Sequence, residues 1–111
     1  MLIPYNATIR LIKRPGKMDR YGQPIYNTVY DEVHCCIEES SALLLDENGN
    51  AQRIDAVLTL EPEFVLRVSD LIIMEEPRTE EYRVFDARSD IDANGVTESR
   101  TVRLVKVVQE V

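Results

Sequence analysis

The residues with the clearest chemical meaning lie near the end of the chain, where oxygen-bearing side chains alternate at Asp90, Asp92 and Asn94 and Gly95 and Glu98 follow. This spacing matches the first part of a helix–loop–helix calcium loop. The twelfth position is a threonine rather than the bidentate glutamate, and neither flank has the pattern of an amphipathic helix. Asp, Asn and Gly are also the residues that a tight turn between strands requires. We therefore expect a turn without a specific metal, and keep a calcium site on Asp90, Asp92, Asn94 and Glu98 as the alternative.

The single histidine, His34, is followed directly by Cys35 and Cys36. On a strand His34 and Cys36 share a face, which gives two zinc ligands where a structural site needs four. Cys35 points the other way, so His34 cannot readily act as its base. We expect a partly buried histidine and two reduced cysteines. With no glycine-rich phosphate loop in the chain either, we expect no cofactor and no enzyme.

Basic residues are concentrated at the start of the chain. Residues 1–20 hold five bases and one acid, a net charge of +4, and the remaining residues hold eight bases and nineteen acids, a net charge of −11. This division indicates a docking module whose basic part meets an acidic surface on another copy or on a partner. A solvated loop and passive contact with DNA are alternatives, although the acidic remainder would repel phosphate. The residues expected to dock are Arg10, Lys13, Arg14, Lys17, Arg20 and Tyr21.

The length of 111 residues predicts one domain over residues 1–111. No apolar run approaches the roughly 20 residues that cross a bilayer. The first residues lack the features of a signal peptide, so we expect synthesis in the cytoplasm and no membrane partner.

Short runs of alternating apolar residues predict an all-β protein, a small antiparallel barrel or sandwich with long loops. The clearest alternation, at 54–60, predicts a half-buried strand, and Asn48-Gly49 predicts a hairpin. All glycines and prolines are expected between strands, with loops at 15–24 and 88–99, and a short helix at 41–47 is possible. Strands are expected near 7–11, 25–37, 43–45, 51–60, 71–74, 82–87 and 102–108.

Seven segments follow one another along the chain: ATIRL at 7–11, YGQPIY at 21–26, VHCCIEES at 33–40, LDENG at 45–49, AVLTL at 56–60, VSDLII at 68–73 and EYRV at 81–84. In this order they resemble the head-tail connector proteins of tailed bacteriophages, of the head-closure or stopper type, which are also known as minor capsid proteins. The family commonly has glycine before the aspartate where this chain has Ser69. Tail-completion proteins of the phage neck are a similar family. The resemblance extends over nearly the whole chain and consists of this order of strands.

The resemblance implies a β-barrel that forms a homo-oligomeric ring, sixfold or twelvefold, in the neck of the virion. The expected partners are the portal or adaptor protein on one side and tail proteins on the other, with DNA passing through the channel. Such a ring closes the head after DNA packaging and offers a docking surface to the tail. The charge division suits a ring, because each interface joins two different surfaces of identical subunits. The competing class is a small ligand- or calcium-binding β module.

Overall fold

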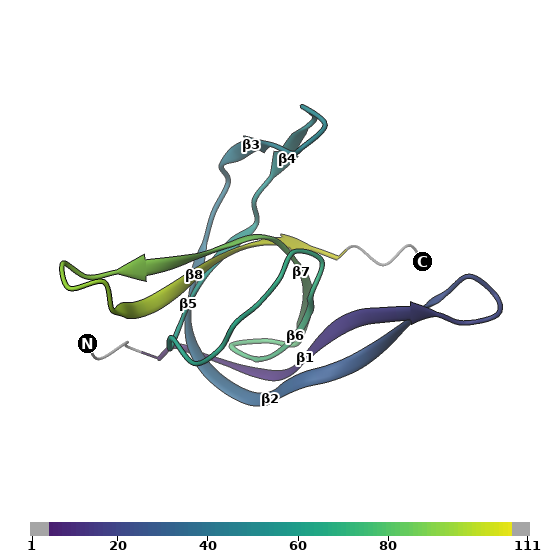
Figure 1. The fold of residues 1–111 in the computed structure, drawn as a ribbon, viewed down its shortest axis with the longest axis horizontal. Helices are drawn as coiled ribbons and strands as arrows, with labels where there is room; N and C mark the ends of the chain where they lie inside the picture. Colours follow the sequence, from purple (N-terminus) through teal and green to yellow (C-terminus); the bar gives the residue numbers. More distant parts are fainter. Residues whose placement is uncertain (1–4, 108–111) are drawn as a thin grey trace.

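The computed structural model describes residues 5–107 and contains eight strands joined by turns and loops (Figure 1). No helix in this part of the chain could cross a membrane. The all-β prediction is confirmed. The strands are β1 (Ala7–Met18), β2 (Pro24–Glu39), β3 (Leu43–Leu45), β4 (Ala51–Arg53), β5 (Ala56–Leu60), β6 (Leu71–Glu76), β7 (Glu80–Ile91) and β8 (Thr97–Lys106).

Six strands close into an antiparallel barrel in the order β1-β2-β5-β8-β7-β6, with β6 pairing back to β1. Closure leaves the body of the sheet without a free edge. β3 and β4 form a separate two-stranded sheet. The sequence predicted either a barrel or a sandwich, and the structure is a barrel.

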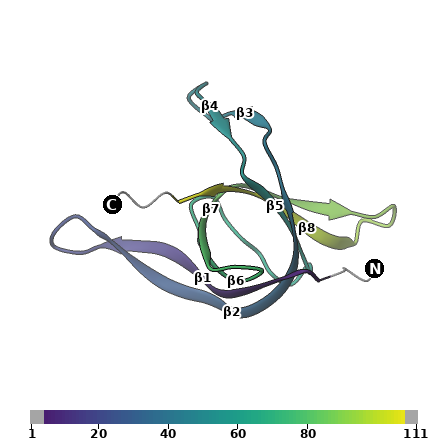
Figure 2. The same cartoon turned by 180° about the vertical axis from the view of Figure 1, so that it is seen from behind.

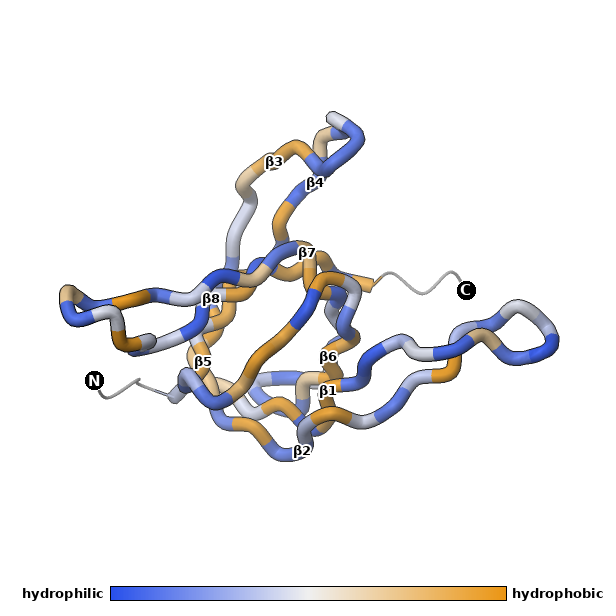
Figure 3. Tube along the Cα trace, in the orientation of Figure 1, coloured by the Kyte–Doolittle hydropathy of each residue, from blue (hydrophilic) through white to orange (hydrophobic). Residues whose placement is uncertain are grey.

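The barrel interior is filled by buried apolar residues from each of its six strands. Hydrophobic and hydrophilic residues follow one another along these strands (Figure 3). On β5, Ala56, Leu58 and Leu60 are buried, and Val57 and Thr59 between them are only partly covered. The predicted alternation is thus confirmed. The 71–74 run is a strand as predicted, but it buries Ile72 and Met74 and leaves the residues between them partly covered.

On β1 the buried residues are Ala7, Ile9 and Ile12, so the alternation expected through Leu11 is interrupted. The register with β6 shifts between Ile9 and Leu11, which pair with Met74 and Ile73. One extra residue on β1, Arg10, accounts for the shift, because a bulge of this kind changes which side chains face inward.

The β1–β2 hairpin and the β7–β8 hairpin both extend beyond the barrel wall and project from it (Figures 1 and 2). β1 stops pairing with β6 at Lys13, and β8 begins pairing with β5 at Arg100. We call residues 14–27 the basic arm and residues 90–99 the acidic arm. The hairpin of β3 and β4, residues 43–53, is the middle arm.

Three expectations about local structure are wrong. The loop expected at 15–24 is mostly strand, because β1 continues through Pro15 and Gly16 to Met18. The loop expected at 88–99 is the outer part of β7 and β8 around a short turn. The possible helix at 41–47 is instead β3 and the start of the middle arm's turn, and the hairpin predicted there is confirmed. Residue 108, at the end of the last expected strand, lies outside the described residues.

The segment between β5 and β6 crosses one open end of the barrel (Figure 1). Leu66 on this cap segment, residues 61–70, is buried in the core. Phe64 packs edge-on against Tyr30, with ring centroids 5.2 Å apart, and the Val65 N–H donates to the Tyr30 hydroxyl at 3.1 Å. The cap segment is therefore tied to β2 at the root of the basic arm.

Candidate functional site

The three arms share one turn architecture. In each turn an aspartate Oδ1 accepts the backbone N–H groups two and four residues later, at 2.8–3.0 Å. The residue three positions after each aspartate is a glycine. Its φ is positive, between 77° and 81°, a conformation that residues with a side chain rarely adopt. Each turn has the sequence pattern Asp-x-x-Gly. The aspartate and glycine are Asp19 and Gly22 in the basic arm, Asp46 and Gly49 in the middle arm, and Asp92 and Gly95 in the acidic arm.

This shared turn gives the calcium-like pattern a structural role. Asp92 uses Oδ1 for its own turn, and Asn94 and Gly95 supply the geometry of that turn. Asp90 lies on β7, where its Oδ2 accepts hydrogen bonds from Thr101 at 2.6 Å and Ser99 at 3.0 Å. These hydrogen bonds hold the pKa of Asp90 below its ordinary value. Asp90 and Asp92 are thus engaged by the protein itself, and Glu98 is exposed on β8.

We expect calcium to bind this arm no more tightly than about 0.1 mM. Titration calorimetry and a thermal melt with and without calcium would measure the affinity. The matched control is Asp90→Ala, which removes one candidate ligand. Micromolar binding that Asp90→Ala abolishes would contradict the turn interpretation. Within residues 5–107 no group of three or more His, Cys, Asp or Glu side chains is placed to hold a metal.

The predicted docking residues are distributed over two environments. Arg10 is exposed on the barrel wall, and Lys13 is partly buried where the basic arm begins. Lys17 and Arg20 are exposed near the tip, where the Arg20 guanidinium lies 5.0 Å from the centroid of the Tyr21 ring. Tyr21 itself is 74% exposed.

Arg14 differs from the other basic residues. Its Nε and Nη2 each donate to a carboxylate oxygen of Asp70 at 3.0 Å, and Asp70 is completely buried. The hydrogen bonds from Arg14 to Asp70 raise the pKa of Arg14. Asp70 also accepts the Arg67 N–H at 2.8 Å, and Arg14 donates to the Val65 carbonyl. Arg14 therefore holds the cap segment to β1 and is not a freely available docking residue.

His34 is exposed, which corrects the expectation that it is partly buried. Its neighbours on β2, Val33 and Cys35, face the core, so His34 faces outward. Its Nδ1 lies 3.3 Å from Thr8 Oγ1. Cys35 is buried, and burial raises the pKa of its thiol to about 12, which keeps it protonated near neutral pH.

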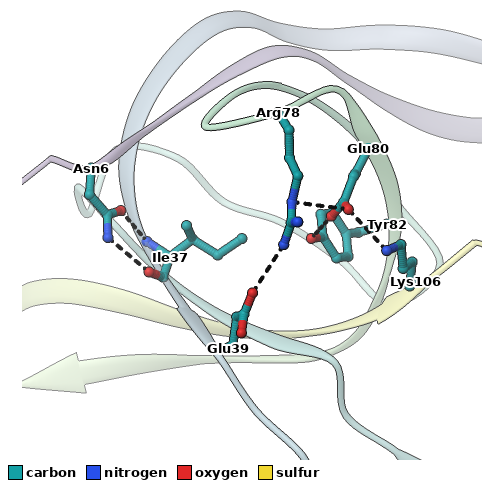
Figure 4. A network of polar contacts seen from close by, with 7 residues as sticks. All are labelled: Asn6, Ile37, Glu39, Arg78, Glu80, Tyr82 and Lys106. Carbon is teal, nitrogen blue, oxygen red and sulfur yellow. Dashed lines mark hydrogen bonds and ion pairs between the residues drawn. The ribbon is translucent and has the colours of Figure 1, made fainter.

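A polar network lies against the barrel wall near the start of β7 (Figure 4). Glu80 accepts hydrogen bonds from Tyr82 and from Lys106 at 2.9 Å, and it forms an ion pair with Arg78 at 3.2 Å. Hydrogen bonds from Tyr82 and Lys106 lower the pKa of Glu80, whereas burial and the nearby Glu80 raise the pKa of Tyr82. Arg78 also binds Glu39 at 3.0 Å. The network links β7 to β8 and β2 and so braces the barrel wall.

The exposed apolar side chains on the arms were not predicted from the sequence. Leu43 and Leu45 of the middle arm are 69% and 70% exposed, and Met18 of the basic arm is 67% exposed. A cleft of about 940 Å³ lies between the middle arm and the barrel wall at β7 and β8. Leu45, Phe85 and Val105 are among its apolar lining residues, and Asp46 and Glu47 are among its acids. The arms and this cleft are the surfaces suited to contact with other proteins.

Comparison with protein family models, curated proteins and solved structures gave no match for this chain.

Proposed function

We propose that this protein is a structural component of the neck of a tailed bacteriophage. Copies form a ring below the portal and adaptor, close the head after DNA packaging and give the tail its docking surface. Tail completion in the same neck is the nearest alternative role.

The observation that carries this proposal is a closed barrel with three projecting arms that expose large apolar side chains. The barrel buries its own core and has no free sheet edge, so the wall itself is complete without a partner. The arms instead place Met18, Tyr21, Leu43, Leu45, Ile91 and Val96 in solvent. Each arm thus carries exposed large apolar side chains that a partner could cover. A barrel with a fully buried core and arms with exposed apolar side chains is the arrangement expected of a small subunit that assembles with others.

The backbone at Ser69 supports the resemblance to the connector family. Ser69 has φ of 75°, a conformation that favours glycine, and the family commonly has glycine at this position. The next residue is Asp70, which accepts the hydrogen bonds of Arg14. The same local bend is therefore needed in this chain, where serine adopts it at some cost.

We expect Ser69→Gly to stabilise the protein by about 0.5–1 kcal/mol, because glycine relieves the left-handed strain. Thermal or urea unfolding would measure the change. Ser41→Gly is the matched control, since Ser41 is exposed and has no positive φ. A loss of stability at Ser69 as large as at Ser41 would show that the backbone there is not strained.

Deletion of the gene in its host tests the proposed function. We expect capsids that package DNA, lose it and carry no tails, which electron microscopy and a nuclease-protection assay would detect. Supplying the intact gene from a plasmid should restore joined particles. Tailless capsids that keep their DNA would favour tail completion instead. Normal, infectious particles from the deletion strain would refute a role in the neck.

A further inference from the structure

The basic and acidic arms project from opposite sides of the barrel, as both views of the molecule show (Figures 1 and 2). Each copy thus presents one arm on either side. A second copy placed beside the first can bring its acidic arm to the basic arm of the first copy.

The two arms have opposite charge. Residues 14–27 contain three bases and one acid, a net charge of +2, and residues 90–99 contain three acids and no base, a net charge of −3. Arg14 pairs with Asp70 and Asp90 pairs with Arg88, both partners outside the arms, so the charge left for a neighbour is +1 on the basic arm and −2 on the acidic arm. On the basic arm, Lys17 and Arg20 are exposed beyond the Arg14–Asp70 pair. On the acidic arm, the turn uses only the Oδ1 atom of Asp92 as a hydrogen-bond acceptor and does not use Oδ2. Glu98 is exposed.

Both arms also carry exposed apolar side chains beside these charges. Met18 and Tyr21 lie on the basic arm, and Ile91 and Val96, 62% and 58% exposed, lie on the acidic arm. Apolar contact surrounded by complementary charges is the usual composition of a specific protein interface.

We propose that the basic arm of one copy docks on the acidic arm of the next copy. This inference rests on the proposed ring and names the contact that joins its subunits. The two surfaces are different, so the contact is head-to-tail and leaves both outer arms open for further copies, as a ring requires. Glu98 and the Oδ2 atom of Asp92, which the turn does not use, then face the neighbouring subunit. The complementary surface is on the same chain, so no other partner is needed for this contact.

A pair of cysteines tests the contact directly. The substitutions are Tyr21→Cys and Val96→Cys, one on each arm tip, followed by mild oxidation of concentrated purified protein and of assembled particles. The variant with both cysteines should give a ladder of dimers, trimers and longer species. An equal mixture of the two single variants should give dimers only, because each chain then has one reactive arm. Native Cys35 and Cys36 are present throughout, so oxidation of wild-type protein gives their background.

Charge reversal gives a second measurement. Lys17→Glu with Arg20→Glu should lower the yield of cross-linked species roughly tenfold or more in the two-cysteine protein, because like charges then meet. Asp92→Asn with Glu98→Lys, which keeps the Oδ1 acceptor of the turn, should also lower it. Mixing the two charge variants should restore dimers, since the unchanged arms are complementary. Arg67→Glu with Arg83→Glu, at exposed positions outside the arms, makes the same charge change as the first variant and should leave the yield unchanged.

The outcomes separate this contact from the proposed function. A ladder in purified protein, together with particles that lack the protein, would support the arm contact and refute the neck role. Particles that contain the protein in the neck but show neither the ladder nor the charge effect would refute the arm contact and leave the neck role standing. Dimers from one single-cysteine variant well above the background of wild-type protein would also refute the contact, because like arms would then be meeting.

Discussion

Replacing Arg14 with glutamate is expected to destabilise the fold by about 3 kcal/mol, the low end for breaking a buried ion pair. Asp70 is completely buried, and its carboxylate would lose both hydrogen bonds from Arg14 while a second carboxylate is placed beside it. The low end applies because the Arg14 side chain is 25% exposed. Chemical unfolding would measure the loss, and a melt should show a fall in Tm of roughly 10–20 °C.

The matched control is Lys17→Glu, the same change of charge three residues further along the basic arm. Lys17 is exposed, so its replacement should change the free energy of unfolding by no more than about 0.5 kcal/mol. Equal effects of the two substitutions would show that the Arg14–Asp70 pair does not hold the cap segment. The sequence placed Arg14 with Lys17 and Arg20 among the docking residues, whereas the ion pair with Asp70 gives Arg14 a role in holding the fold.

Leu58→Ala should destabilise the protein by about 2–5 kcal/mol, because it empties a fully buried position in the middle of β5. Urea unfolding followed by circular dichroism would measure the change. Leu45→Ala on the middle arm removes the same atoms from a side chain that is 70% exposed. It should cost no more than about 0.5 kcal/mol.

The same two variants separate folding from assembly. Leu45→Ala protein should fold normally, and any defect it shows in joining heads to tails would then come from the arm surface. A large loss of stability from Leu45→Ala would instead mean that the middle arm packs on the barrel and is not a free surface.

Much of the fold could be predicted because strand burial follows from local alternation. β5 is the clearest example, since every second residue is buried. The hairpin at Asn48-Gly49 was also predictable, because its turn depends on residues that are adjacent in the sequence.

Two of the wrong expectations, the loops at 15–24 and 88–99, concern long strands that leave the barrel. Pro15 and Gly16 favoured a loop, yet beyond Lys13 β1 pairs only with β2, and a proline is tolerated on such an edge. The polar residues at 88–99 also favoured a loop. In the structure only the short turn at Asp92 depends on such residues, and the rest of the segment is strand. Hydrophobic alternation is a weak signal where neither face of a strand is buried.

The candidate site was only partly predictable. The basic cluster identified the arm that carries Lys17 and Arg20, because charge composition is local. The partner of Arg14 lies 56 positions away in the sequence, and only the closed barrel brings Asp70 to it. The exposure of Leu43 and Leu45 was equally hidden, since an apolar run reads the same whether it packs inside or projects outward.

The most direct test of a neck component is electron cryomicroscopy of tailed particles from the host that carries the gene. The account predicts a ring of copies of this barrel between portal or adaptor and tail, with the basic arm of each copy against its neighbour. Joined particles whose neck is filled entirely by other proteins, from cells that express this chain, would contradict it.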